Sequence, residues 1–300
     1  MGDPVAGYRC GFVSLAGRSN VGKSTLLNAI VGEKLSIVTH KPQTTRFRQA
    51  GIKTTSRAQI IFIDTPGLHR GAGRALNRAM NRTAMQTMSE GDLVLLVVES
   101  FRWTKEDEDL LARLKDVKVP VVVAANKIDL VTPTEALLPQ IESPAARRDF
   151  HAIVPISARR GTNLDQLERV IIESLPEGPP MYPAGQRTDR DEQFHAAELI
   201  REHLLLRLQQ ELPYGSQVGI ERFEDTGQIL QIAAIIWVER AAHKAIVIGR
   251  KGSMLKGIGS AARVALEERF GKQVNLKLWV KVRESWSDNA ADLQRFGYDT

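Results

Sequence analysis

A glycine-rich loop directly after an apolar segment constrains this chain more than any other feature. The short apolar run Cys10–Ala16 is typical of a buried strand, and it leads into Gly17–Ser24, which reads GRSNVGKS. The pattern GxxxxGK[ST] arises by chance in roughly one in a hundred chains of this length. Between a strand and a helix, such a loop presents backbone N–H groups to an anion. The spacing therefore predicts an α/β fold that binds phosphate here.

Further motifs follow in a fixed order: QTTR from Gln43, DTPG from Asp64, NKID from Asn126 and SAR from Ser157. The expected strands of this part of the chain are Cys10–Ala16, Gln59–Ile63, Leu93–Val98, Val121–Ala125 and Ile153–Ile156. Most of these strands run straight into a motif, and open α/β sheets bind ligands at the carboxyl ends of their strands. The pattern predicts a P-loop domain with a mostly parallel central sheet.

The phosphate loop and DTPG contain candidate ligands for phosphate and Mg²⁺. Lys23 is expected to reach the β- and γ-phosphates, and the Ser24 hydroxyl to bind Mg²⁺. Asp64 would hold the metal from the other side through water, and Gly67 would offer its backbone N–H to a γ-phosphate.

The two threonines of QTTR offer the remaining Mg²⁺ ligand. We expect Thr45 to bind, with Thr44 as the alternative, because sequence alone does not separate adjacent threonines. Both this segment and the one from Asp64 to about Arg82 would then be switches, ordered with triphosphate and loosened after hydrolysis.

The NKID motif predicts which base is bound. A carboxylate at Asp129 accepts hydrogen bonds from N1–H and the exocyclic amine of guanine, whereas adenine would leave it unpaired. Lys127 would lie over the base, so GTP is the expected nucleotide. The predicted nucleotide contacts are Gly17, Arg18, Ser19, Asn20, Val21, Gly22, Lys23, Ser24, Thr25, Asp64, Thr65, Pro66, Gly67, Asn126, Lys127, Asp129, Ser157, Ala158 and Arg159.

The residue after the DTPG glycine bears on how GTP would be hydrolysed. Small GTPases that position water with glutamine carry it there, but this chain has Leu68, so another group, a cation or a partner must act. Asn20 is a candidate K⁺ ligand beside the phosphates, or else a side chain that only stabilises the loop. Intrinsic turnover is expected to be slow. The predicted catalytic residues are Lys23, Thr45, Gly67 and Asn20.

The composition changes at Pro176–Arg190, which contains four prolines and two glycines and is typical of a linker. We expect a GTPase domain over residues 1–178, a linker over 179–190 and a second domain with a C-terminal tail over 191–300. The second domain has the expected order α-β-β-α-α-β, which suits a type II KH domain.

A GxxG loop in the second domain lies in a strongly basic tract. Between Arg240 and Arg283 there are 11 basic residues against only Glu267 and Glu268. The loop follows an apolar helix end and precedes another helix, as in a KH domain, whose GxxG clamps a nucleotide backbone beside an apolar groove; the alternative is a plain turn between helices. The predicted RNA contacts are Gly249, Arg250, Lys251, Gly252, Lys244, Lys256 and Ile248.

Composition limits the class of protein. The net charge is +6, Cys10 is the only cysteine, and no apolar run reaches 18 residues. These features exclude an internal disulfide and suit a folded protein of the reducing cytoplasm.

The combination resembles the bacterial Era GTPases, which are P-loop GTPases of the TrmE-Era-EngA type, over essentially the whole chain. KPQTTR, DTPGLH, VIGRKG and the closing LWVKVRESWSDN carry the resemblance. It implies binding to the 3′ end of small-subunit ribosomal RNA, a role in assembling the 30S subunit, and peripheral association with the inner face of the cell membrane. We expect a monomer in solution.

Two other functions stay open at this point. One is an RNA-binding adaptor in which GTP is structural and hydrolysis is negligible, an alternative that Leu68 supports. The other is a tRNA-modifying or membrane-transport GTPase, which shares the nucleotide motifs but does not need a GxxG loop in a basic tract.

Overall fold

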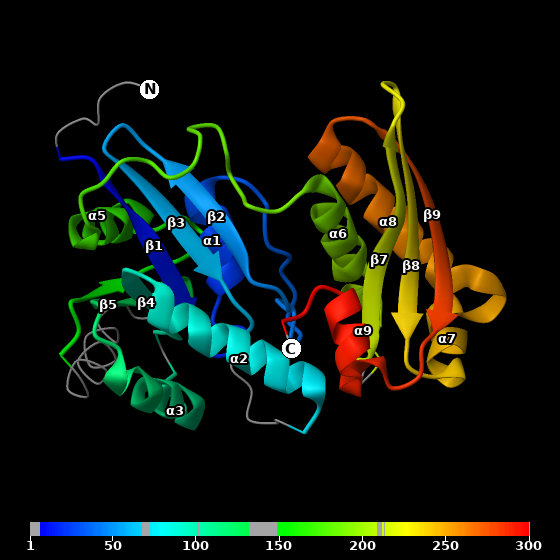
Figure 1. Ribbon diagram of the computed structural model, residues 1–300, viewed down its shortest axis with the longest axis horizontal. Helices are drawn as coiled ribbons and strands as arrows, with labels where there is room; N and C mark the ends of the chain where they lie inside the picture. The colour runs from blue at the N-terminus through cyan, green and yellow to red at the C-terminus, as the bar shows by residue number, and fades with distance from the viewer. Residues whose placement is uncertain are drawn as a thin grey trace. The chain divides into compact units, whose positions relative to one another are not determined.

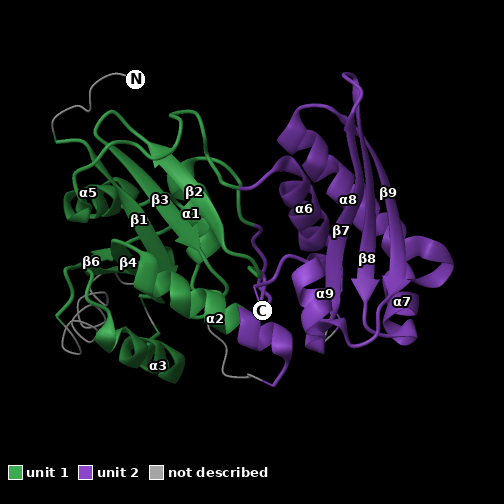
Figure 2. Cartoon of the chain, viewed as in Figure 1, with its two compact units in different colours: residues 1–36, 45–70, 80–189 green, residues 37–44, 71–79, 190–300 purple. Residues whose placement is uncertain are grey.

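The computed structural model describes residues 7–67, 73–100, 102–131, 149–208, 212 and 214–299. The chain divides into two compact units, one of residues 1–36, 45–70 and 80–189 and the other of residues 37–44, 71–79 and 190–300 (Figure 2). The main division falls between Asp189 and Arg190, inside the proline-rich stretch. Two short segments of the N-terminal half, residues 37–44 and 71–79, belong to the second unit. A single boundary along the sequence, as predicted, does not describe this division.

The first unit is built on a six-stranded sheet with the order β2-β3-β1-β4-β5-β6 (Figure 1). Its strands are β1 (Arg9–Ala16), β2 (Gln49–Thr54), β3 (Ala58–Asp64), β4 (Leu93–Glu99), β5 (Val121–Asn126) and β6 (Ala152–Pro155). Only β2, which pairs with β3, is antiparallel. The predicted mostly parallel sheet is confirmed, whereas β2 was not predicted from the sequence.

Helices cover both faces of this sheet, as the near-continuous apolar strands require. The helical segments are α1 (Lys23–Val31), α2 (Ala75–Glu90), α3 (Lys105–Arg113), η1 (Leu114–Asp116), η2 (Ile128–Leu130) and α5 (Leu164–Ser174). Alternate side chains of β4 and β5 point to opposite faces, so α1 and α5 pack in one core and α2 and α3 in another. This double layer holds the carboxyl ends of the parallel strands at one edge.

The second unit has a three-stranded sheet, β7-β8-β9, with β7 antiparallel and β9 parallel to β8. Its elements are α6 (Glu192–Arg207), β7 (Ser216–Asp225), β8 (Ile229–Val238), α7 (Ala241–Ile248), η4 (Arg250–Gly252), α8 (Ser253–Phe270), β9 (Gln273–Val282), η5 (Trp286–Asp288) and α9 (Ala290–Arg295). Every second residue of β8 is buried against α6 and α8, which gives this unit a core of its own. The element order agrees with the predicted α-β-β-α-α-β.

Among the residues that the structure describes, no helix is both long enough and apolar enough to cross a bilayer.

Candidate functional site

The phosphate loop leaves the end of β1 and enters α1, as its strand–loop–helix spacing predicts. Gly22 has a left-handed φ of 105°, and a Cβ there would lie 2.3 Å from Asn126 Nδ2. A Cβ at Gly17 would lie 2.5 Å from the carbonyl oxygen of Val97. The loop therefore needs glycine at both positions, because its backbone passes directly against neighbouring strands.

The Lys23 side chain is held under the phosphate loop. Its ammonium group donates to the carbonyl oxygens of Gly17 at 2.8 Å and Arg18 at 3.0 Å, and the residue is only 7% exposed. Burial lowers the pKa of Lys23 from 10.5 to about 8, although the nearby Asp64 charge opposes that shift. An anion in the loop would compensate this buried charge.

Three oxygen-bearing side chains meet where Mg²⁺ is expected. Ser24 Oγ lies 2.9 Å from Thr45 Oγ1 and 3.0 Å from Asp64 Oδ2. Asp64 is fully buried, and its Oδ1 has no hydrogen-bond partner among the described residues. Burial raises the pKa of Asp64, an effect that Lys23 and the hydrogen bond from Ser36 oppose. Hydroxyl and carboxylate oxygens are ligands that Mg²⁺ prefers, so these residues fit the metal.

The two adjacent threonines lie in different surroundings. Thr44 Oγ1 is 2.5 Å from Thr39 Oγ1 and donates to the Lys41 carbonyl at 2.7 Å. Thr45 Oγ1 instead lies beside Ser24, so the geometry favours Thr45 as the Mg²⁺ ligand.

The base-recognition residues converge at the ends of β5 and β6. Asn126 donates to the Val21 carbonyl at 2.8 Å and accepts from the Ala158 N–H at 2.9 Å. The Ser157 hydroxyl donates to Asp129 Oδ1 at 2.6 Å, which orients the carboxylate. The phosphate loop, NKID and SAR thus form one hydrogen-bonded group. NKID and SAR meet because they follow β5 and β6, which are adjacent parallel strands.

Glu99, at the end of β4, is a site residue that the sequence analysis missed. It forms ion pairs with both Lys127 and Arg18, while Lys127 Nζ also donates to the Asn20 carbonyl at 2.8 Å. Burial would raise the pKa of Glu99, but its hydrogen bonds to the two cations outweigh this and lower the pKa overall. The sequence did contain a sign of this role, because Glu99 is an acidic residue at the end of an otherwise apolar strand.

The segment after β3 lies beside the phosphate loop. A Cβ at Gly67 would be 3.1 Å from Ser19 Oγ and 3.4 Å from Lys23 Nζ. Leu68 lies outside the described residues, so its consequence for water positioning stays a prediction. Arg159 is exposed in the loop after β6. The remaining predicted contacts lie at the start of α1 and just after β3: Thr25, Thr65 and Pro66.

The GxxG loop joins α7 to α8 in the second unit. Gly249 has a φ of 74°, and a Cβ there would lie 2.6 Å from Met254 Cβ. Gly252, with a φ of 79°, is the N-terminal cap of α8. Arg250 and Lys251 are both exposed between these glycines, where they can reach a phosphate.

A groove of about 400 Å³ lies beside the GxxG loop, between α8 and β9. It is lined by Gly252, Leu255, Lys256, Gly259, Ser260, Arg263, Leu276 and Leu278. Of the predicted RNA contacts outside the loop, Lys256 lines this groove, whereas Ile248 packs against the core and Lys244 is not among the lining residues. The apolar lining comes from Leu255, Leu276 and Leu278, which were not predicted from the sequence. The small residues Gly259 and Ser260 in α8 were the available sign that this face of the helix is hollowed.

Comparison with known families gives a separate match for each part of the chain. Residues 12–127 match the family described as 50S ribosome-binding GTPase, and residues 211–287 match the KH domain family. The chain is 49% identical to GTPase Era of Stenotrophomonas maltophilia strain R551-3 over 292 residues, or 97% of this chain and 98% of that relative. It is 48% identical to GTPase Era of Pseudomonas aeruginosa strain LESB58 over 296 residues, or 99% of this chain and 97% of that relative.

Two solved Era structures have the same fold. A crystal structure of Aquifex aeolicus Era bound to GDP·AlF₄⁻ matches with a TM-score of 0.94 and 38% identity, covering 97% of this chain and 100% of the other. Era in complex with MgGDPNP and nucleotides 1506–1542 of 16S ribosomal RNA also has a TM-score of 0.94 and 38% identity, with coverages of 98% and 100%. The predicted fold class is confirmed: the chain is a GTPase with a C-terminal KH domain, and it belongs to the Era family.

Proposed function

We propose that this chain is a GTP-hydrolysing switch that binds small-subunit ribosomal RNA near its 3′ end and acts in assembly of the 30S subunit. The observation that carries the proposal is that one chain combines an oxygen-ligand group at Ser24 and Asp64 with a GxxG loop beside a groove. The complex of Era with nucleotides 1506–1542 of 16S ribosomal RNA supports this choice of RNA.

In this proposal the first unit holds GTP through its own hydrogen-bonding groups. The Lys23 ammonium, already aligned by two loop carbonyls, would contact the β- and γ-phosphates. Asp129, oriented by the Ser157 hydroxyl, would accept from guanine N1–H and the 2-amino group. Ser24, Thr45 and, through water, Asp64 would hold Mg²⁺, which neutralises negative charge on the phosphate oxygens.

We also assign to Asn20 the role of a K⁺ ligand beside the phosphates. Its backbone φ of 65° and its carbonyl contact with Lys127 fix the residue at the turn of the phosphate loop. The amide oxygen of Asn20 is a ligand of the kind that K⁺ accepts, so the side chain of Asn20 is the group to test.

The second unit would hold single-stranded RNA along the GxxG loop. Arg250 and Lys251 would contact phosphates, while bases would lie against Leu276 and Leu278 between the cations Lys256 and Arg263. Peripheral association with the inner membrane face follows only from the family resemblance. It remains a prediction, as do a monomeric state and a cytoplasmic location.

A paired charge-reversal experiment tests the proposed function. Changing Arg250→Glu together with Lys251→Glu should abolish binding of a 16S 3′-terminal RNA fragment and leave the Kd for GTP unchanged. The matched control, Lys115→Glu with Lys118→Glu, alters the charge equally at exposed positions of the first unit. Normal RNA affinity in the first variant would instead favour a GTPase that acts on other targets.

Mapping the crosslinked RNA with GTP and with GDP bound then tests the switch. The crosslinks should differ between the two states if nucleotide controls RNA binding, and identical maps would contradict the switch. Measuring GTP hydrolysis with K⁺ and RNA present would show how far turnover departs from the slow rate expected of the chain alone.

A further inference from the structure

β9 is an edge strand of the sheet in the second unit, and its two faces differ in character (Figure 1). The apolar residues of one face, such as Val274 and Val280, pack in the core. The opposite face, which we call the outer face of β9, carries side chains that are all exposed: Gln273, Asn275, Lys277, Trp279 and Lys281. Residues two apart on a strand share a face, so these side chains form one row. An exposed tryptophan therefore lies between two lysines on a polar strand face.

Trp279 is unusual in its exposure. It is 45% exposed, although an indole is among the largest apolar groups that a fold can bury. Its neighbour on β8, Ile235, is only 1% exposed. By contrast, Trp286 in the same unit is fully buried, and its Nε1 donates to the Gly215 carbonyl at 3.1 Å. Nearly half of the Trp279 surface is therefore open to a partner.

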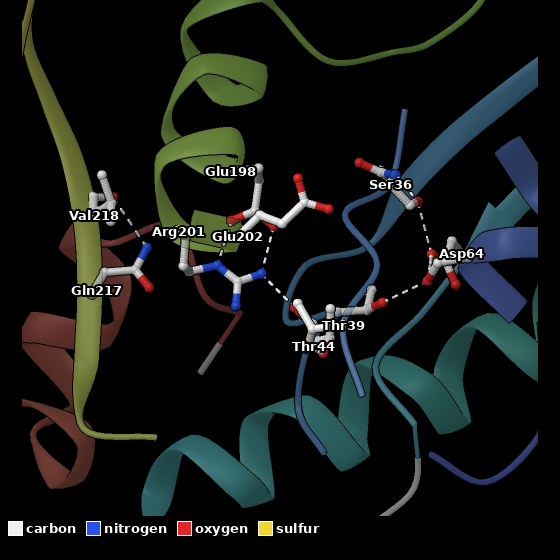
Figure 3. Close-up of polar contacts among 12 residues, drawn as sticks. Ser36, Thr39, Thr44, Asp64, Glu198, Arg201, Glu202, Gln217 and Val218 are labelled. Carbon is white, nitrogen blue, oxygen red and sulfur yellow. Dashed lines mark hydrogen bonds and ion pairs between the residues drawn. The ribbon is translucent and has the colours of Figure 1, made fainter. Parts of the chain in front are cut away.

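The C-terminal segment covers only one side of this sheet. The Tyr298 hydroxyl donates at 3.0 Å to Oε1 of Gln217, which Figure 3 shows on β7. The Phe296 ring lies 6.1 Å from the ring of Trp237 on β8. Lys281 is the next residue across the sheet from Trp237, and it is exposed. The C-terminal segment thus closes the β7 side of the sheet and leaves the outer face of β9 open.

The charge on the outer face of β9 favours a polyanion. Lys277 is exposed and forms no ion pair within the described part of the chain. Lys281 Nζ lies 3.5 Å from Glu221, but both side chains are about half exposed, and a phosphate can replace such a weak pair. Two lysines beside an indole suit single-stranded RNA, which combines phosphate charges with bases that stack. A second copy of this chain fits less well, because a two-fold contact would bring the same lysines of both copies together.

The outer face of β9 is continuous with the groove beside the GxxG loop. A second hollow, of about 650 Å³, lies where β9 begins. It shares Arg263 with the groove and Asn275 with the outer face of β9. Lys272 adds a second cation to this hollow, against the single carboxylate of Glu267. An RNA chain held in the groove can therefore continue through the hollow onto the outer face of β9.

We propose that the outer face of β9 is a second contact surface for single-stranded RNA, in which a base stacks on Trp279 while Lys277 and Lys281 hold phosphates. The inference rests on the proposed function, in which the GxxG groove holds RNA. It adds nucleotides to the roughly four that a GxxG loop clamps. From Asn275 to Lys281 the strand spans about 20 Å, which is long enough for more than one nucleotide. The affinity should therefore depend on the length of the RNA.

The test varies RNA length with the full-length chain. Fragments of the 16S 3′ end of about five nucleotides fill the GxxG groove alone, whereas fragments of about twelve also reach the outer face of β9. Trp279→Ala should raise the Kd for the longer fragment about tenfold, as expected for the loss of one stacked base, and leave the Kd for the shorter one within about twofold. Trp279→Phe keeps a ring and should retain most of the affinity. Val264→Ala, at an apolar position of α8 that is 57% exposed, is the control and should change neither Kd.

A second variant and a spectroscopic signal make the test independent of stability. Lys277→Glu changes only an exposed side chain, and it should also weaken binding of the longer fragment alone. The indole N–H signal that disappears from the NMR spectrum of Trp279→Phe belongs to Trp279. In the unmodified chain this signal should shift with the longer fragment and not with the shorter one.

Three results would overturn the inference and leave the proposed function intact. They are equal binding of both fragments by the unmodified chain, an equal loss for both fragments in Trp279→Ala, and a dimer that Trp279→Ala converts to a monomer in size-exclusion chromatography. If instead the variant with Arg250→Glu and Lys251→Glu binds both fragments normally, the groove is not the RNA site. The proposed function then fails, and the inference fails with it.

Discussion

Replacing Gly22 by alanine is predicted to remove nucleotide binding while the chain stays folded. The residue has a φ of 105°, and an added Cβ would lie 2.3 Å from Asn126 Nδ2. Forcing alanine into left-handed backbone costs about 1–2 kcal/mol. Displacing the amide also weakens two hydrogen bonds, one to the Val21 carbonyl and one from the Ala158 N–H, each worth about 1 kcal/mol.

The free chain can relieve these costs, about 3 kcal/mol together, by moving the phosphate loop away from the geometry that binds nucleotide. Restoring that geometry on binding then costs the same amount, which corresponds to a loss of more than about a hundredfold in affinity. The loss should be equal for GDP and GTP, because both nucleotides use the phosphate loop and the base site. Isothermal titration of each nucleotide in excess Mg²⁺ measures the two Kd values.

Gly32→Ala is the matched control, since it lies at the opposite end of α1. Gly32 has a φ of 78°, but an added Cβ there would meet nothing within 4 Å. It should therefore lower the unfolding temperature through backbone strain and leave nucleotide affinity unchanged. A Gly22→Ala protein that binds GDP within about twofold of the unmodified chain would refute the reasoning.

Further predictions concern charge and ion binding around the same loop. Glu99→Gln should weaken GDP and GTP binding by about tenfold, because it loosens both Lys127 and Arg18; unchanged nucleotide dissociation rates would contradict this role. Without nucleotide, the Lys23 pKa of about 8 lies below its unfolded value of 10.5. The unfolded chain then binds more protons between these values, so the contribution of Lys23 makes stability rise with pH in this window. NMR titration of the lysine side chains measures the pKa directly, and a midpoint at the ordinary lysine value would refute the burial argument. Asn20→Ala should abolish any stimulation of hydrolysis by K⁺, with Na⁺ as the control cation; stimulation that persists would exclude Asn20 as the ligand.

Local motifs were predictable because their chemistry depends on contiguous residues. The phosphate loop needs only a strand, two glycines, Lys23 and a following helix, and all of these lie within one stretch of sequence. The same holds for the GxxG loop, where Gly249 and Gly252 supply the left-handed backbone between two helices. The strands that lead into the motifs were predictable from their unbroken apolar character.

Features that depend on distant pairing were not predictable in this way. β2 has the mixed sequence QAGIKT and was missed, since its place depends on Gly51 lying so close to Leu27 that a Cβ would be 2.5 Å from Leu27 Cδ1. Glu99 was missed because its partners, Lys127 and Arg18, come from two other loops. The apolar lining of the groove beside the GxxG loop depends on which face of β9 turns toward α8.

The nucleotide, the fold class and the position of the GxxG loop could be predicted from contiguous motifs and from the apolar strands that lead into them. Only the tertiary structure placed Thr45 rather than Thr44 beside Ser24. It also joined Thr44 to Arg201, 157 residues further along the chain. The physical reason is that every residue has a backbone carbonyl, so the sequence does not mark which one accepts a given hydrogen bond. Only the folded chain shows that the buried Arg201 guanidinium donates to the carbonyl of Thr44 (Figure 3).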